Sequence, residues 1–327
     1  MKRSLSLLSS ALSFLCATLV ANAQDPVVAS VTAVPMQKAK VQAPGYDKIG
    51  DALYEVIYDY RVNTKATGQL SVRSEGNVIK VRTAEAETTE GQDDSVTDTF
   101  TTILQFGPVQ ARFLDYLSFR VDSLVFAKAP DDSLSKASRE VDRSAFFFEP
   151  VVFQNWPEGS LIVDDILVPG IFTYSEDMAL DWTIEDGSKE VCGYPCQEAK
   201  TSYGGREWTV WYSPMIPSNS GPWKLCGLPG LILEAQDTEG IHHFTATSLR
   251  KASCPIVRVQ DAGRDKTQRD RFIQRKNAAG GNSLNNVPTE SISSISVFKN
   301  DNGGTIKING RVTVRQTNHA WVPLELK

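Results

Sequence analysis

The chain has 327 residues, of which 22% are charged and 41% are hydrophobic. This ordinary globular composition excludes collagen-like, coiled-coil and wholly disordered proteins, and the length suffices for one large domain or two modest ones. The formal net charge is -5. Because non-specific nucleic-acid binding needs a basic surface, we expect no nucleic-acid partner.

The first 23 residues have the organisation of a secretory signal peptide. Lys2 and Arg3 form a basic start, residues 5–20 are mostly apolar, and Ala21-Asn22-Ala23 is an A-x-A cleavage site. Cleavage there makes Gln24 the first mature residue. The sequence therefore predicts export to the periplasm or the extracellular space.

Cys16 leaves lipidation open as an alternative to a cleaved, lipid-free N-terminus. Leu15 disfavours this alternative, since the residue before a lipidated cysteine is normally small. No later window offers the ~20 consecutive apolar residues that a membrane-spanning helix needs. We expect an exported protein without a membrane span.

The mature chain begins with a flexible leader over residues 24–48, which contains three prolines and no clear period. A single β-rich domain is expected over residues 49–327. Its first part alternates in polarity and is rich in β-branched and aromatic residues, which predicts strands within 53–62, 69–73 and 77–82. The acidic stretch 84–98 then predicts a polar excursion from the fold.

Two segments have helical spacing. Apolar residues recur at that spacing over 107–127, with charged residues between them, and predict an amphipathic helix. Residues 261–277 are rich in basic and acidic groups and predict a solvated helix with i,i+4 ion pairs. A docking surface for an acidic partner is the alternative for this second helix.

Strand signals dominate the remaining sequence. Short apolar runs occupy 146–163, and Asp-Gly, Gly-Gly and Glu-Gly pairs punctuate an antiparallel meander over 181–250. A polar excursion is expected near 278–305, followed by a hairpin at Asn309-Gly310 and a last strand near Val322. The fold class is therefore mainly β (α+β): one domain with a curved antiparallel meander or open half-barrel and two helices.

The mature chain keeps four cysteines, Cys192, Cys196, Cys226 and Cys254. In an oxidising compartment an even number predicts disulfides, and four cysteines allow three pairings. The C-x-x-x-C spacing of the first two is neither the redox nor the zinc-ribbon spacing. A turn at Gly193-Tyr194-Pro195 would let these two join; otherwise each pairs with one of the other two. We expect all four to be oxidised, with Cys226 tied to the 192–196 segment.

Familiar catalytic signatures are absent from the sequence, which contains no G-x-S-x-G, H-E-x-x-H or P-loop motif. His242 and His243 are adjacent on a predicted strand, so they point to opposite faces and cannot easily share a metal. We expect no metal and no cofactor. Acidic pairs such as Asp164-Asp165 leave a glycosidase-type carboxylate dyad open, but the sequence does not support one.

The most informative stretch is an aromatic strand followed by a proline-punctuated loop. Arg206, Trp208 and Tyr212 share one face of the strand, and Trp211 lies on the other. Large apolar groups on both faces indicate either packing on both sides or a ligand groove on one. The candidate ligand or partner contacts are Arg206, Trp208, Trp211, Tyr212, Pro217, Trp223 and Lys224.

The loop leads into Gly227-Leu228-Pro229-Gly230-Leu231-Ile232. Pro229-Gly230 predicts a type II turn in which Gly230 supplies the positive φ. No residue of the six can act as acid, base or nucleophile. We therefore interpret the hexapeptide as architectural, with any ligand contact made by the strand and loop before it.

These residues carry a family resemblance. GLPGLI at 227–232, with ordered flanks that include Gly205-Arg206, Trp208 and Gly221-Pro222-Trp223-Lys224, resembles the GLPGLI family of exported Bacteroidetes proteins. The ending Pro323-Leu324-Glu325-Leu326 is similar to the family's C-terminal part. The resemblance implies export and no established activity, with frequent occurrence beside TonB-dependent transport components. By analogy only, the aromatic meander resembles the half-barrels of lipoprotein carriers.

Two classes of function compete. The first is a binding or accessory protein of the cell envelope that holds an apolar or peptide-like ligand or docks on an outer-membrane transporter. The missing catalytic motifs favour it. The alternative is an envelope hydrolase, which would need two carboxylates about 5 to 10 Å apart in a cleft. A third interpretation assigns function to the variable loops alone.

Overall fold

A computed structural model describes residues 29–32, 45–65, 70–75, 78–83, 95–143, 148–167, 170–260, 263–281, 295–300, 303–308, 312–317 and 320–327. The predicted signal peptide and most of the predicted leader lie outside these residues. In the described part of the chain, no helix is long and apolar enough to cross a membrane.

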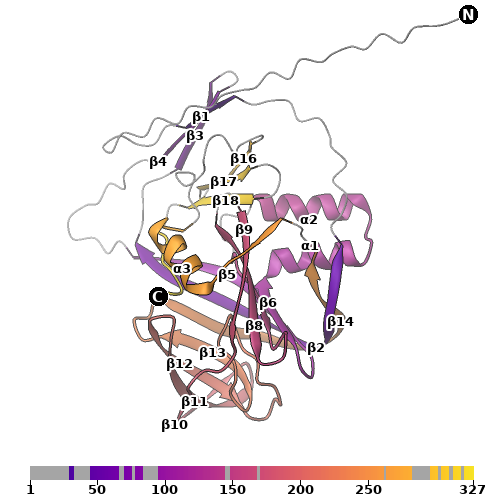
Figure 1. Ribbon diagram of the computed structural model, residues 1–327, viewed down its shortest axis with the longest axis vertical. Helices are drawn as coiled ribbons and strands as arrows, with labels where there is room; N and C mark the ends of the chain where they lie inside the picture. Colours follow the sequence, from indigo (N-terminus) through magenta and orange to yellow (C-terminus); the bar gives the residue numbers. More distant parts are fainter. Residues whose placement is uncertain are drawn as a thin grey trace, which may run out of the picture.

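The fold is mainly β: a mostly antiparallel open sheet of twelve strands, with three helices (Figure 1). The strands, in sheet order, are β10 (Thr183–Val191), β11 (Tyr194–Tyr203), β12 (Arg206–Ser213), β13 (Leu231–Asp237), β14 (His242–Val259), β2 (Tyr46–Lys65), β5 (Ser95–Phe106), β6 (Ala111–Asp115), β7 (Val151–Gln154), β8 (Ser160–Leu167), β9 (Gly170–Asp177) and β15 (Arg264–Lys266). Among the strand pairs of the described residues, only β9–β15 is parallel. The expected antiparallel meander is confirmed.

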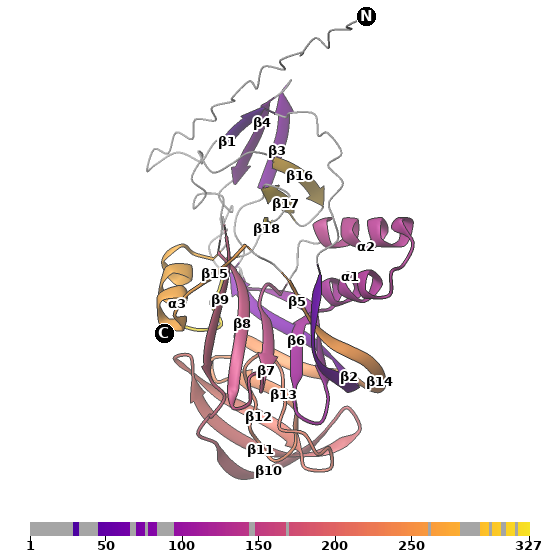
Figure 2. The ribbon, with the colours of Figure 1, turned by 45° about the vertical axis from the view of Figure 1, so that its right-hand side comes forward.

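Two three-stranded sheets lie at the end of the molecule away from β10–β12 (Figures 1 and 2). They are formed by β1 (Ala29–Thr32), β4 (Val78–Thr83) and β3 (Leu70–Glu75), and by β16 (Ile295–Asn300), β17 (Gly303–Ile308) and β18 (Val312–Thr317). The leader and the excursion near 278–305 thus contain strands: β1 pairs with the distant β4, whereas β16 pairs with the adjacent β17. Ile308 pairs with Val312 as a hairpin requires, although Asn309-Gly310 lies outside the described residues.

The helices differ from the expected two. They are α1 (Tyr116–Phe126), α2 (Asp131–Arg143) and α3 (Arg269–Ala278). Residues 111–115 of the first expected helix form β6, which is buried throughout, and a strand buried on both faces has no alternation to set it apart from a helix. Asp115 ends the strand and caps α1, because its Oδ1 accepts from the backbone N–H of Leu117 at 2.8 Å and of Ser118 at 3.2 Å.

The second expected helix begins later than its charge pattern indicated, at Arg269, because Arg264–Lys266 pairs with β9 as β15. It is not merely solvated: Phe272 and Ile273 are buried. The ring of Phe272 lies 5.4 Å from that of Tyr174 on β9. Helix α3 therefore covers one end of the sheet rather than standing free.

The sheet curls so strongly that distant strands meet. Phe113 on β6 and Phe244 on β14 are three positions apart in the strand order, yet their ring centroids are 5.9 Å apart. At the two ends of the sheet, the hydroxyl of Tyr203 on β11 donates to Glu176 on β9 at 2.5 Å. Figure 2 shows the curved sheet, and buried side chains from both of its halves form the main core.

Candidate functional site

The aromatic face predicted for β12 is packed into the core. Trp208 and Trp223 are each 1% exposed and Tyr212 is 2% exposed. The indole ring centroids of the two tryptophans lie 5.7 Å apart. Arg206, Trp208 and Tyr212 do share one face, as expected, but that face turns inward and leaves the tryptophans and the tyrosine no surface for a ligand.

The other predicted contacts are scattered. Trp211 lies half-buried on the opposite face, with Lys189 Nζ 3.3 Å from its ring centroid. Pro217 is exposed in the loop. Arg206 is 5% exposed and ion-paired with Asp237 and Glu239 at 2.8 Å each. The seven predicted residues thus form no single contact surface.

The backbone of the GLPGLI stretch differs from the predicted type II turn, and its Leu228, Leu231 and Ile232 are buried. Gly230 has no positive φ; a Cβ there would lie 2.4 Å from the backbone oxygen of Ser213. Gly227 is the residue with positive φ, at 100°. The glycine before the buried Leu231 and Ile232 therefore permits a close backbone approach, which the sequence cannot reveal.

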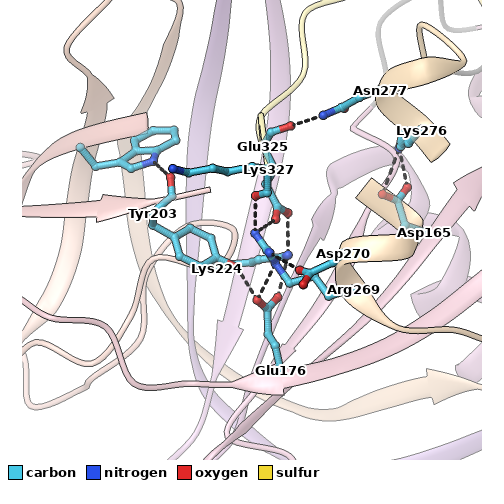
Figure 3. A network of polar contacts seen from close by, with 11 residues as sticks. Asp165, Glu176, Tyr203, Lys224, Arg269, Asp270, Lys276, Asn277, Glu325 and Lys327 are labelled. Carbon is cyan, nitrogen blue, oxygen red and sulfur yellow. Dashed lines mark hydrogen bonds and ion pairs between the residues drawn. The ribbon is translucent and has the colours of Figure 1, made fainter. Parts of the chain in front are cut away.

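Lys224 is the centre of a buried ion-pair network (Figure 3). Its side chain is 0% exposed, and its Nζ lies 2.6 Å from Glu176 Oε1 and 2.6 Å from Glu325 Oε1. The rings of Tyr174, Trp223 and Tyr203 surround the ammonium, with centroids 4.9, 5.6 and 5.7 Å from Nζ. Two carboxylates and an aromatic cage thus compensate one fully buried charge.

Arg269 of α3 closes the network. Its Nε lies 3.1 Å from Glu176, and its guanidinium donates to Glu325 at 2.5 Å. Burial opposes the charged form of Arg269, but Glu325 and Glu176 outweigh it and raise the pKa of the guanidinium. Burial and the same two carboxylates raise the pKa of Tyr203. The network ties β9, α3 and residues 320–327 to the loop before GLPGLI.

An open groove adjoins this network. Its volume is about 1010 Å³, and it lies between the β11–β12 turn, α3 and the end of the 320–327 segment. The groove is lined by Glu176, Ser202, Tyr203, Gly204, Gly205, Arg206, Glu207, Arg269, Asp270, Ile273, Gln274, Asn277, Leu326 and Lys327. Three cationic and three acidic side chains contribute to this lining, so the groove suits a polar ligand that carries both charges.

The sequence missed most of this site. Glu176 carries no local signal, and Tyr203 ends a strand like many others. Arg269 belongs to the basic helix, and Glu325 belongs to the Pro-Leu-Glu-Leu ending noted for its family resemblance. Residues 320–327 contain no strand, contrary to the strand expected near Val322. Of the predicted contacts, only Arg206 lines the groove, and only Lys224 and Trp223 belong to the network beneath it.

The four cysteines of the described residues are free thiols, contrary to the expected disulfides. Cys192 and Gly193 form the two-residue turn between β10 and β11, whereas Cys196 lies on β11. Cys226 is buried beside the backbone oxygen of Lys224, and the thiol of Cys254 donates to Glu55 at 3.4 Å. A turn, two different strands and the loop before GLPGLI carry the four thiols, and none is joined to another.

The histidines lie on opposite faces of β14, as predicted. His242 is 0% exposed; its Nδ1 lies 2.9 Å from the Tyr60 hydroxyl and its Nε2 lies 3.0 Å from the backbone oxygen of Pro323. Burial, helped by Arg206, lowers its pKa to about 3, so the ring is neutral. His243 pairs with Glu234 on the other face. Among the described residues, no group of three or more metal-ligating side chains comes together.

Asp164 and Asp165 do not form a dyad. Asp164 pairs with Arg258 and Arg264, whereas Asp165 accepts from the buried Lys276 at 2.8 Å. Adjacent residues of β8 point to opposite faces, so the two carboxylates diverge. The closest approach to a carboxylate pair at the groove is Glu176 with Glu325, which share Lys224.

Comparison with known proteins gives a short match and a distant one. A search of curated proteins finds no match. Two structures of PNGF-II, in space groups P21 and C2, are similar at 16% identity, with TM-scores of 0.38 and 0.37. The aligned region covers 68% and 69% of this chain but 32% of each PNGF-II chain, so it spans about a third of their length. Residues 204–234, which include Trp223 and Lys224, match a family described as a protein of unknown function (Porph_ging).

Proposed function

We propose that the protein is an exported binding protein of the cell envelope that holds a peptide-like ligand in the groove between the β11–β12 turn and α3. The observation that carries this proposal is the groove itself, about 1010 Å³ in volume, which adjoins the buried ion-pair network around Lys224. Ligand sites are commonly concavities of this size with a few fixed polar groups.

The groove's chemistry favours a peptide over an apolar ligand. Arg206, Arg269 and Lys327 face the groove together with Glu176, Glu207 and Asp270. Such a lining suits the alternating donors, acceptors and charges of a peptide. The apolar alternative loses its support, because the aromatic residues that would have received an apolar ligand pack against one another in the core.

Export and location belong to the same proposal. The basic start, apolar stretch and A-x-A site of residues 1–23 support a signal peptide cleaved after Ala23, and the GLPGLI resemblance supports a periplasmic or extracellular protein of the Bacteroidetes type. A segment of an outer-membrane transporter is a partner that fits this location. The intact mass of protein from an exporting host tests it: a chain beginning at Gln24 is expected, and a lipidated Cys16 would contradict it.

A carboxylate-pair hydrolase remains the second candidate because Glu176 and Glu325 lie side by side below the groove. Both carboxylates, however, are engaged by Lys224 and Arg269. Neither can attack a substrate or deliver a proton without first breaking these ion pairs. This arrangement favours binding over hydrolysis.

The binding proposal is tested with a library of zwitterionic hexapeptides and with a fluorescent apolar probe. We expect peptides to bind, and binding to weaken at least fivefold when Glu207 and Asp270 on the groove rim are both changed to alanine. The matched control changes Asp186 and Glu190 to alanine; both are exposed on β10, and the change in net charge is the same. Binding of the apolar probe alone, or equal loss in both double variants, would overturn the proposal. Release of cleaved peptide would favour the hydrolase.

A further inference from the structure

Residues Ala320–Lys327, here called the strap, lie on the protein like a bound peptide. The strap contains no helix or strand, yet several of its backbone groups form hydrogen bonds with the rest of the protein. The Pro323 oxygen accepts from Arg206 at 2.8 Å and from His242 at 3.0 Å. The Glu325 oxygen accepts from Asn277 at 2.9 Å, and the Leu326 N–H donates to the Gly204 oxygen at 2.6 Å.

The strap also inserts one acidic side chain into a specific pocket. Glu325 is 5% exposed, and its two carboxylate oxygens lie 2.6 Å from Lys224 Nζ and 2.5 Å from the Arg269 guanidinium (Figure 3). Charge-assisted contacts of this kind discriminate strongly between a carboxylate and a neutral amide. Backbone contacts along the segment with a pocket for one side chain are the usual elements of peptide recognition.

The β11–β12 turn is shaped for this segment. A Cβ on Gly204 would lie 3.0 Å from Glu325 Cγ, and a Cβ on Gly205 would lie 3.0 Å from Leu326 Cβ. Both glycines have positive φ, so the turn passes under the strap where a larger residue would collide with it. The turn, the pocket and the donors together form a receptor surface for an extended chain.

Departure of the strap would leave this surface with unmet donors. Lys224 and Arg269 would keep Glu176, but Arg206 and His242 would lose the Pro323 oxygen, and Asn277 would lose the Glu325 and Leu326 oxygens. The emptied surface would expose these donors to water, and another segment with the same acceptors could then replace the hydrogen bonds that the strap had made.

The groove offers such a segment a way in. Leu326 and Lys327 of the strap belong to the groove lining, so the groove is continuous with the end of the strap. A peptide held in the groove can therefore begin to replace the strap from that end. Against the wild-type chain it competes with a strap tethered at high effective concentration.

We propose that the strap is an internal ligand, and that the groove's partner is an extended peptide that displaces it by placing a glutamate in the Glu325 pocket. This inference rests on the proposed function and specifies its ligand: an acidic, proline-tolerant segment of a partner protein. The strap acts as an autoinhibitory contact that sets the affinity for this partner.

The test titrates a labelled peptide of sequence AWVPLELK onto the full chain and onto two variants with a weakened strap. Glu325→Gln removes the carboxylate charge that pairs with Lys224. Leu326→Pro removes the backbone N–H that donates to the Gly204 oxygen. Both changes lie in the strap and leave the residues of the receptor surface unchanged. We expect the peptide to bind both variants at least tenfold more tightly than wild type. A peptide with glutamine in place of the glutamate should bind at least tenfold more weakly.

Equal affinity for wild type and variants, or for the two peptides, would overturn the inference. Loss of folding in both variants, seen by circular dichroism, would also overturn the inference. It would show that the fold depends on the bound strap, so that a partner peptide could not displace it. Dimers that dissociate when the peptide is added would identify a second copy of this chain as the occupant and exclude a separate partner. If hexapeptides bind the wild-type groove but the strap peptide binds neither variant, only this inference fails; if no peptide binds any form, the proposed function fails as well.

Discussion

At the scale of single residues, close backbone approach explains more than turn propensity does. The GLPGLI stretch suggested a positive φ at Gly230, whereas the residue is needed because β12 ends against it. The carbonyl of Ser213 occupies the space that any side chain at position 230 would require. The end of β12, which lies outside the motif, is therefore what requires a glycine at position 230.

Replacing Gly230 with alanine should therefore destabilise the fold by roughly 2–3 kcal/mol, as overpacking against a rigid backbone does. Thermal unfolding followed by circular dichroism measures the change. Pro229→Ala is the matched control, because Pro229 is exposed and its loss should cost less than about 1 kcal/mol. A Gly230→Ala variant that melts like wild type would show that the contact with Ser213 is not rigid.

His242 makes stability depend on pH. Its pKa is about 3 in the folded protein, against 6.5 for an ordinary histidine. Below pH 6.5 the unfolded chain binds a proton that the folded chain excludes, so the free energy of unfolding falls as the pH falls towards 3. At pH 5 this loss amounts to about 2 kcal/mol relative to pH 7.

Denaturant titrations at pH 7 and pH 5 test this effect. His242→Gln should lose that part of the pH dependence, even if its stability at pH 7 is lower. His243→Gln, on the opposite face of the same strand, is the matched control because it leaves His242 in place. If wild type, His242→Gln and His243→Gln all lose the same free energy of unfolding between pH 7 and pH 5, His242 is protonated inside the fold.

At the scale of elements, side chains of the sheet organise the long loop between β12 and β13. Gln154 on β7 is 1% exposed, and its amide donates to the Gly221 oxygen at 2.7 Å and to the Trp223 oxygen at 2.8 Å. These two hydrogen bonds satisfy the buried loop carbonyls of Gly221 and Trp223.

Gln154→Leu keeps the shape of the side chain and leaves two buried carbonyls without donors, which should cost ~3 kcal/mol. Urea unfolding at neutral pH gives the value. The control is Gln274→Leu, at an exposed position of α3, where the change should stay within about 0.5 kcal/mol. If the two variants unfold at the same urea concentration, water replaces the lost donors and the loop is not sealed.

At the scale of the whole molecule, burial in the fold limits the reactivity of the cysteines. Cys226 is 0% exposed, and burial raises the pKa of its thiol to about 12. Burial also raises the pKa of Cys196 and of Cys254 to about 11. Little thiolate is available at neutral pH, so exchange into disulfides is slow.

We therefore expect four titratable thiols in the mature chain after denaturation without reductant. In the native protein, Cys192 should react first with a thiol reagent because it lies half-exposed at the β10–β11 turn, and Cys226 should react last. Labelled peptides identified by mass spectrometry give the order. Fewer than four thiols in the denatured, unreduced protein would show that some of these residues form a disulfide.

The sequence by itself determined the class of the fold, the antiparallel meander and the alternation of β12, because these follow from neighbouring residues. It also singled out Lys224 and the GLPGLI stretch, although it interpreted their surroundings as a contact surface. Local pattern failed where burial on both faces hid a strand at residues 111–115, and where a partner far along the chain created strands in the leader.

Only the tertiary structure decided the site. Lys224 and Glu325 are 101 residues apart, and they meet because the curled sheet brings β9 to β11 and lets the strap cross between them and α3. No spacing in the sequence encodes such a contact, since the position of each charge depends on the packing of the whole sheet. The burial of the aromatic face was decided in the same way, because alternation shows which side chains share a face but not whether that face turns towards a ligand or a core.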